Sequence, residues 1–370
     1  NPIISVHDHG AGGHLNCLSE LVENTGGKIY LDKLPVGDPT LSDKEIIGNE
    51  SQERMGLVLK EKDTELISRI AVRERAPMYV IGETTGDKQF TFLNNVDGSK
   101  PLDLQLENMF GNPPKTVLND ISIKSDFDDI DYNESRLYDY LENVLQIENV
   151  ACKDWLTNKV DRSVTGRVAK QQTCGAVQLP LNNLAVAALD YSGFKGVATA
   201  LGHAPVSGLI NAGNGSVLSI AESLTNIIWA PIENGLKGIS LSANWMWPCK
   251  NTGEDSRLYE GVKAASDFAL ELGINIPTGK DSLSMTQKYK DGDMVYSPGT
   301  VIISAAGEVT DIRKVVEPVI KHCDNSLLIY IDLSKDKLEL GGSSFAQVNK
   351  KIGRYVPTIK DPKYFIRVFN

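Results

Sequence analysis

The spacing of apolar residues predicts strands and helices that alternate along the chain, which indicates an α/β (α+β) fold class. The opening stretch, residues 5–14, leads out of a short apolar strand and into an amphipathic helix through residues 17–22. A second helix is expected after Thr64, which we place as its cap. The other strands predicted in this first part are Lys28–Leu31, Gly56–Leu59, Met78–Ile81 and Phe90–Leu93.

Residues 111–134 interrupt this alternation, because Pro113, Pro114 and the acidic run 126–131 are typical of a linker. A helix is predicted at 135–145, and a second αβ unit follows to about residue 310. Its longest predicted helix, 256–272, carries apolar and small residues on one face. A strand at Ser326–Leu333 and a helix from Phe345 are expected to begin a third unit.

The composition indicates a globular protein without nucleic-acid or membrane partners. Hydrophobic residues make up 41% of the chain, charged residues 23%, and the net charge is −10. That charge argues against binding a phosphate backbone, and no apolar run is long enough to span a bilayer. We therefore expect a cytoplasmic protein. The scattered cysteines are predicted to be reduced core residues; they are Cys17, Cys152, Cys174, Cys249 and Cys323. Three tryptophans are also predicted to fill the core: Trp229, Trp245 and Trp247.

The glycine-rich stretch after the first strand is the leading candidate for phosphate chemistry. Asp8 ends the strand, and three glycines between residues 10 and 13 let the backbone approach a ligand. The Asp8 carboxylate is suited to Mg²⁺, while free N–H groups at the helix start face oxyanions. His7, His9 and His14 offer no third ligand at zinc spacing, so we do not predict a zinc site.

Three further polar stretches have two interpretations each. The segment 49–54 can satisfy a polyol or amide group, or can be a solvated loop. The stretch from Gly279 to Ser282 lacks the spacing of a P-loop, and an oxygen-rich Mg-phosphate turn remains open. Glu222 and Asn226 lie one helical turn apart and can share a metal, although a solvated helix face explains them as well.

Eight short blocks resemble, in order, the synthetase portion of the phosphoribosylformylglycinamidine synthase family in its large single-chain form. They cover essentially the whole chain and read HDHGAGG at His7, NESQERM at Asn49, RERAP at Arg73, SVTGRVA at Ser163, SLTN at Ser223, LSANWM at Leu241, GEDSRLY at Gly253 and TGKDSLSM at Thr278. The resemblance implies aminoimidazole ribonucleotide synthetase-like units: a partial B1 unit at 1–110, a linker at 111–134, a complete A2 unit at 135–310, and the start of a B2 unit at 311–370. The chain would then be an internal fragment.

The resemblance also implies a reaction: formylglycinamide ribonucleotide, glutamine and ATP give formylglycinamidine ribonucleotide, glutamate, ADP and phosphate through an iminophosphate. Ammonia would come from a glutaminase domain of the full-length chain, and Mg²⁺ with ATP or ADP would be the cofactors. The fragment alone is expected to be inactive. The alternatives are a non-catalytic nucleotide-binding scaffold, or another ATP-using relative such as selenophosphate synthetase or thiamine-monophosphate kinase.

Site residues follow from the same resemblance, with no catalytic residue in this segment. They are Asp8 as a Mg²⁺ ligand; Glu50, Ser51, Gln52 and Ser282 for the ribonucleotide; Gly279, Lys280 and Asp281 for nucleotide or metal; and Glu222, Asn226, Asn182 and Asn183 at a second, non-catalytic nucleotide site, with Glu222, Asn226 and Asn183 as metal ligands. The family pattern has Asp where this chain has Asn183, and a neutral amide binds Mg²⁺ more weakly than a carboxylate. We also expect residues 326–370 either to cover a sheet edge of the first unit or to form a homodimer or swapped dimer.

Overall fold

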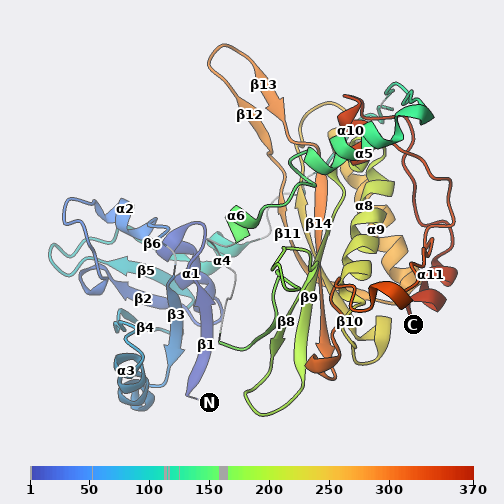
Figure 1. Cartoon of the computed structure of the whole chain (residues 1–370). Helices are drawn as coiled ribbons and strands as arrows, with labels where there is room; N and C mark the ends of the chain where they lie inside the picture. The colour runs from blue at the N-terminus through green and yellow to red at the C-terminus, as the bar shows by residue number, and fades with distance from the viewer. Residues whose placement is uncertain (1, 52, 112–114, 116, 125, 158–165) are drawn as a thin grey trace. The chain divides into compact units, whose positions relative to one another are not determined.

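The computed structural model in Figure 1 describes every residue of the chain except 1, 52, 112–114, 116, 125 and 158–165. The chain divides into two compact units, residues 1–116 and 117–370. No described helix combines the length and the apolar composition that a membrane crossing requires.

The first unit combines a four-stranded sheet with a separate two-stranded antiparallel ribbon. The sheet order is β4-β2-β5-β6, with β2 and β5 parallel, and β1 pairs with β3 in the ribbon. Phe90 and Phe92 are fully buried and anchor a core that includes Leu18 and Ile29. The elements are β1 Ile3–Asp8, α1 Gly13–Leu21, β2 Gly27–Tyr30, η1 Leu31–Lys33, α2 Asp43–Ile47, β3 Met55–Leu59, η2 Glu61–Asp63, α3 Thr64–Arg73, β4 Gly82–Thr84, β5 Gln89–Leu93, β6 Leu102–Gln105 and α4 Leu106–Phe110.

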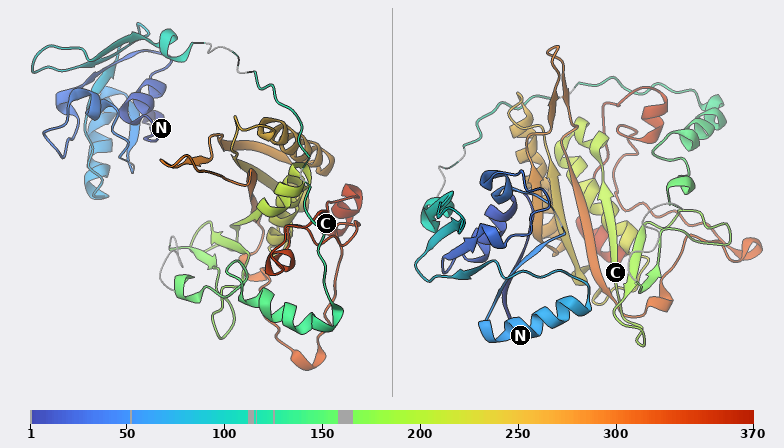
Figure 2. Two further views of the ribbon diagram at one scale, coloured as in Figure 1. Left: turned by 90° about the horizontal axis from the view of Figure 1, so that it is seen from above. Right: turned by 90° about the vertical axis from the view of Figure 1, so that its left-hand side faces the viewer.

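The second unit is built on a six-stranded mixed sheet of order β11-β10-β14-β9-β8-β7, in which β10 and β11 are parallel. Helices α8 and α9 lie side by side against one face, and the β12–β13 hairpin projects away (Figures 1 and 2). The elements are η3 Glu134–Arg136, α5 Leu137–Gln146, α6 Asp154–Thr157, β7 Val168–Lys170, β8 Leu184–Ala188, β9 Gly196–His203, α7 Pro205–Ile210, α8 Ala212–Ile227, η4 Gly235–Gly238, β10 Ile239–Met246, α9 Glu254–Leu272, β11 Asn275–Ser282, β12 Thr286–Lys288, β13 Met294–Tyr296, β14 Thr300–Val309, η5 Ile312–Lys314, η6 Cys323–Asn325, α10 Ser344–Val348 and α11 Pro362–Phe369.

Small residues on β9 let α8 pack closely on this sheet. Ala198 and Ala200 are buried and point toward the helices, while the residues between them point to the other face. At Gly202 a Cβ atom would lie 1.9 Å from the carbonyl oxygen of Ser219 in α8. Only glycine therefore permits this distance between strand and helix.

Most predicted elements are present, and five expectations are wrong. Thr64 does not cap helix α3 but is its first residue, with Asp63 at the N-cap position. Residues 78–81 form no strand; the short β4 follows them instead. The stretch 326–333 is also not a strand, and Leu328 there is 93% exposed. Trp229 is 54% exposed rather than buried, whereas Trp247 does fill the core. Cys152 and Cys323 are exposed, while the other three cysteines are buried.

The second half of the expected linker is docked on the second unit. Oδ2 of Asp120 accepts a hydrogen bond from the backbone N–H of Asp255 over 3.1 Å, at the start of α9. Nζ of Lys351 pairs with Asp128 at 2.8 Å near α10. We call residues 117–124 and 126–132 the strap, because these contacts tie it to α9 and to the C-terminal segment.

Candidate functional site

The turn between β1 and α1 brings two distant parts of the first unit together. Gly12 and Gly13 both adopt positive φ values, 82° and 59°, which side chains disfavour. A Cβ atom at Gly13 would lie 2.4 Å from the carbonyl oxygen of Asn49. The absence of a side chain therefore lets the backbone of Asn49 lie directly against the turn.

Two of the predicted carboxylates flank this glycine turn. Oε1 of Glu50 accepts a hydrogen bond from the backbone N–H of Gly12 over 2.9 Å. The Asp8 side chain is 75% exposed, and its Oδ2 lies within 4 Å of the position that a Cβ of Gly10 would take. Ser51 is exposed and its N–H donates to Oδ1 of Asn49. Gln52 lies outside the described residues.

Arg54 holds the segment 49–54 in place, a role that the sequence reasoning missed. Its Nη2 donates to the carbonyl oxygen and to Oδ1 of Asn49, at 2.8 and 3.1 Å, and its Nε donates to the carbonyl oxygen of Ser51 at 2.7 Å. Nη1 lies 2.9 Å from Nε2 of His14. An arginine directly before an apolar strand was the available signal, since a partly buried guanidinium requires several acceptors.

The contacts of Arg54 determine which nitrogens of His9 and His14 carry protons. A guanidinium only donates, so Nε2 of His14 accepts, and the His14 proton must be on Nδ1. Nδ1 lies 3.0 Å from Nε2 of His9 and donates to it, which leaves the His9 proton on Nδ1. Burial, followed by the charge of Arg54, lowers the pKa of His14 to about 4, and burial is also the main cause that lowers the pKa of His9. His7 instead pairs with Glu20 at 2.6 Å.

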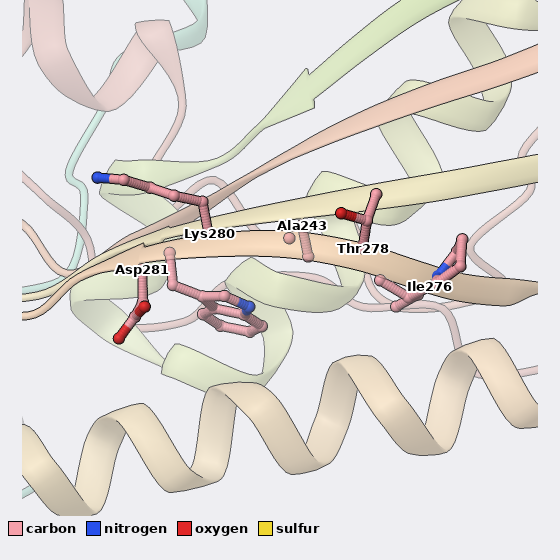
Figure 3. A pocket seen from close by; sticks show the side chains of 8 residues that line it. Ala243, Ile276, Thr278, Lys280 and Asp281 are labelled. Atoms are coloured by element: carbon pink, nitrogen blue, oxygen red, sulfur yellow. The ribbon is translucent and has the colours of Figure 1, made fainter. Parts of the chain in front are cut away.

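The stretch 279–282 is not a turn, because β11 continues through it to Ser282 as an edge strand. Lys280 and Asp281 consequently point to opposite sides of the strand (Figure 3). Nζ of Lys280 donates to the hydroxyl of Ser282 on the same side. A cavity of ≈ 410 Å³ is lined by this strand together with Ala243 and Trp245. The lining of this cavity includes both Lys280 and Asp281 but not Ser282.

The predicted groups around α8 lie together in the second unit. Oε2 of Glu222 accepts from the backbone N–H of His203 at 2.7 Å, and Nδ2 of Asn226 donates to the carbonyl oxygen of Leu201 at 2.9 Å. Nδ2 of Asn183 donates to Oδ1 of Asn226 at 3.2 Å. Asn182 turns away from them and donates to the carbonyl oxygen of Gln171.

A cavity of ≈ 610 Å³ adjoins Glu222. It lies between α8 and the C-terminal segment, and its lining includes Thr225, Lys337, Leu338 and Phe365. Across the described part of the chain, no three His, Cys, Asp or Glu side chains are close enough to hold a metal ion by themselves. Any cation here or at Asp8 would need ligands beyond such side chains.

Two family descriptions match separate parts of the chain. Residues 1–93 match "AIR synthase related protein, C-terminal domain", and residues 152–308 match "FGAR-AT PurM_N-like domain". Similar solved structures include "T. maritima PurL complexed with ADP" and "T. maritima PurL complexed with FGAR", with TM-scores of 0.63 and 0.61. Sequence identity to these structures is 20% and 19%, and the alignments cover 85% of this chain and 48% and 46% of those chains. At such identities they show the fold alone.

Curated relatives are similar along the entire chain. "Probable phosphoribosylformylglycinamidine synthase, chloroplastic/mitochondrial" of Arabidopsis thaliana is 38% identical over 100% of the chain and 27% of its own length. "Phosphoribosylformylglycinamidine synthase" of Dictyostelium discoideum is 38% identical, over 98% of the chain and 28% of that protein. The Homo sapiens protein of the same name is 35% identical, over 100% of the chain and 29% of that protein. The chain thus spans less than a third of the length of these relatives.

Proposed function

The chain belongs to the phosphoribosylformylglycinamidine synthase family, and on this premise we propose that it forms part of an ATP-dependent carbon–nitrogen ligase of purine biosynthesis. The ligase converts formylglycinamide ribonucleotide to the amidine with ammonia derived from glutamine. Because the chain spans less than a third of its curated relatives, it makes no product by itself.

One observation carries this proposal: Glu50 and Asp8 flank the same glycine turn although forty-two positions separate them. Phosphoryl transfer depends mainly on positioned oxygens, backbone N–H groups and Mg²⁺, rather than on a protein nucleophile. The turn offers an exposed carboxylate together with a helix start, which is the chemistry that a metal-phosphate group needs.

The donor set at Asp8 fits Mg²⁺, which is commonly held by one or two carboxylates with substrate phosphates and waters. When bound, Mg²⁺ neutralises charge that develops on the transferred phosphoryl group. Glu50 keeps Oε2 for a hydroxyl of the ribonucleotide, since Oε1 is taken by Gly12. Ser51 and Gln52 complete this substrate contact.

Nucleotide contacts come from β11 and from α8. Lys280 and Ser282 share one face of β11 and meet the nucleotide or the substrate, whereas Gly279 allows a close approach and Asp281 serves the opposite face. The 610 Å³ cavity beside Glu222 forms a second, non-catalytic nucleotide site. That cavity also favours the second candidate function, a scaffold that binds nucleotide without catalysing a reaction.

The test uses the complete synthetase that carries this sequence. Asp8→Asn is expected to lower kcat at saturating substrate and to raise the Mg²⁺ concentration for half-maximal rate. Glu50→Gln is expected mainly to raise KM for the ribonucleotide. The matched control is Glu61→Gln, an exposed carboxylate outside the turn. Unchanged kinetics in Asp8→Asn and Glu50→Gln would refute the proposed site, while turnover by the 370-residue chain with ATP, substrate and ammonia would refute its inactivity.

The remaining proposals concern partners. Ammonia arrives from a glutaminase domain, the chain works in the cytoplasm, and two copies of the isolated chain associate through residues 326–370. The exposed apolar run there, Leu327–Ile331, supports the last of these, because such runs are prone to pair. Sedimentation of the isolated chain tests it, and a monomer at all concentrations would contradict it.

A further inference from the structure

We propose that a hydrogen bond between the Asn183 and Asn226 side chains replaces a metal ion at the second nucleotide site of this chain. The inference rests on the proposed function for the location of that site. It concerns the chemistry of the site, because three groups implied there as metal ligands do not fit a divalent cation in this structure.

The orientation of Asn226 decides the argument, since the oxygen and nitrogen of an amide are otherwise interchangeable. The carbonyl oxygen of Leu201 can only accept, so the Asn226 atom that faces it at 2.9 Å must be Nδ2. Oδ1 of Asn226 then points at Asn183. The Asn183 atom at 3.2 Å from that oxygen must in turn be the donor Nδ2. Asn183 therefore presents an N–H group, not an oxygen, at this position.

The end of strand β9 explains why these side chains are engaged by the protein itself. Strand β8 begins at Leu184, whose partner is Ala200, so β9 continues past it through residues 201–203. Two side chains of α8 satisfy the backbone groups left on this overhang: Asn226 binds the oxygen of Leu201, and Glu222 binds the N–H of His203. Leu201 is 58% exposed and His203 is also exposed, so these side chains take the place that water would otherwise have.

The amide pair extends this arrangement to a third element. Asn183 immediately precedes β8, so its bond to Asn226 joins the start of β8 to the last turn of α8 and, through Leu201, to β9. A metal ion bound by a carboxylate at 183 would join the same elements. With asparagine at 183, one lone pair of Asn226 Oδ1 accepts the Asn183 N–H, and Glu222 is the remaining carboxylate among the three implied ligands.

The adjoining cavity offers a different balance of charge for a nucleotide. The charged residues of its lining are Lys337 and three carboxylates, those of Glu222, Asp332 and Glu339. The lining is therefore net negative, and Lys337 is the ammonium within it that can meet a nucleotide phosphate when residue 183 bridges no cation.

The test restores the carboxylate and follows Mn²⁺ by its broadening of nearby NMR signals. In Asn183→Asp, the His203 backbone amide and the Asn226 side-chain amide are expected to reach half-broadening at a Mn²⁺ concentration at least about tenfold below that of the wild type. Asn183→Asp combined with Glu222→Gln is expected to lose this gain. If wild type and Asn183→Asp reach half-broadening at the same Mn²⁺ concentration, the proposal is overturned. It is also overturned if the double variant without the Glu222 carboxylate keeps the lower Mn²⁺ concentration of Asn183→Asp.

Thermal unfolding supplies an independent measurement. Without metal, Asn183→Asp and Asn183→Ala both lose the amide bond, and we expect a Tm lower by about 2–4 °C. Mg²⁺ is expected to restore the Tm of Asn183→Asp but not that of Asn183→Ala. If Mg²⁺ raises the Tm of the wild type by as much as that of Asn183→Asp, the amide pair does not replace a metal.

Discussion

Arg54 donates a hydrogen bond from Nη1 to Nε2 of His14 over 2.9 Å, and this contact joins the segment 49–54 to the start of α1. The other guanidinium nitrogens bind Asn49 and Ser51. One side chain thereby fixes both the backbone next to the glycine turn and the protonation of two histidines.

Arg54→Met keeps much of the apolar stem of the side chain but removes these donors, and it leaves acceptors of Asn49, Ser51 and His14 without their partner. We expect the free energy of unfolding to fall by about 2–3 kcal/mol. Urea unfolding measures the change. Arg69→Met, at an exposed position on α3, is the control and is expected to stay within about 0.5 kcal/mol of the wild type. Equal effects of the two substitutions would contradict the role of Arg54.

The depressed pKa of His14 predicts a loss of stability in mild acid. The folded chain takes up this proton only near pH 4, whereas the unfolded chain takes it up near pH 6.5. The contribution of His14 to the free energy of unfolding is complete above pH 6.5. It decreases by on the order of 3 kcal/mol as the pH falls toward 4. His14→Asn keeps an acceptor for Arg54 and removes the titration. Its unfolding free energy is expected to vary less between pH 7 and pH 4, and an unchanged slope would rule out His14 as the cause.

Gly202→Ala tests the close packing of α8 on β9. The added Cβ would meet the Ser219 carbonyl oxygen at 1.9 Å, so strand and helix must separate. We expect a destabilisation of about 2–3 kcal/mol in chemical unfolding of the second unit. Gly37→Ala serves as the control, because a Cβ there has no neighbour within 4 Å. A Gly202→Ala chain as stable as this control would show that the helix moves at little cost.

Asp120→Ala tests whether the strap is anchored at α9. The pKa of Asp120 lies below its usual value, mainly because of the backbone N–H of Gly253, with Asp255 and Ser256 adding to it. Loss of this acceptor is expected to accelerate proteolytic cleavage within the strap and hydrogen exchange at the Asp255 amide. Asp131→Ala, in the same acidic stretch, is the comparison. Similar cleavage rates in both variants would mean that Asp120 does not anchor the strap.

Periodic segments were predictable from sequence because their own residues determine them. The long helix at 256–272 was predicted from one apolar face, and it is present as α9. The apolar residues 326–333 resemble a strand equally well, but a strand needs a partner, and no local pattern shows whether one is present. The same limit applies to 279–282, where glycine and polar residues suggested a turn while pairing with β10 extends the strand.

The types of residue in the sequence indicate which residues belong to the candidate site, but they do not show which residues contact one another. The sequence indicates both Asp8 and Glu50 as candidate site residues, and in the structure they lie at one turn. The role of Arg54 cannot be predicted from the sequence, because its partners are backbone oxygens, which a sequence does not display. The sequence indicates Asn183 only as a weak metal ligand, since its donor role depends on how Leu201 orients Asn226.

The missing side chain at Gly13 couples two motifs that lie more than thirty positions apart, the glycine turn and the segment that begins at Asn49. Any side chain at 13 would press on Asn49 and displace Glu50 before it disturbed the helix that follows. A lineage that changes one motif must therefore adjust the other, so the two are expected to covary as a single unit of selection.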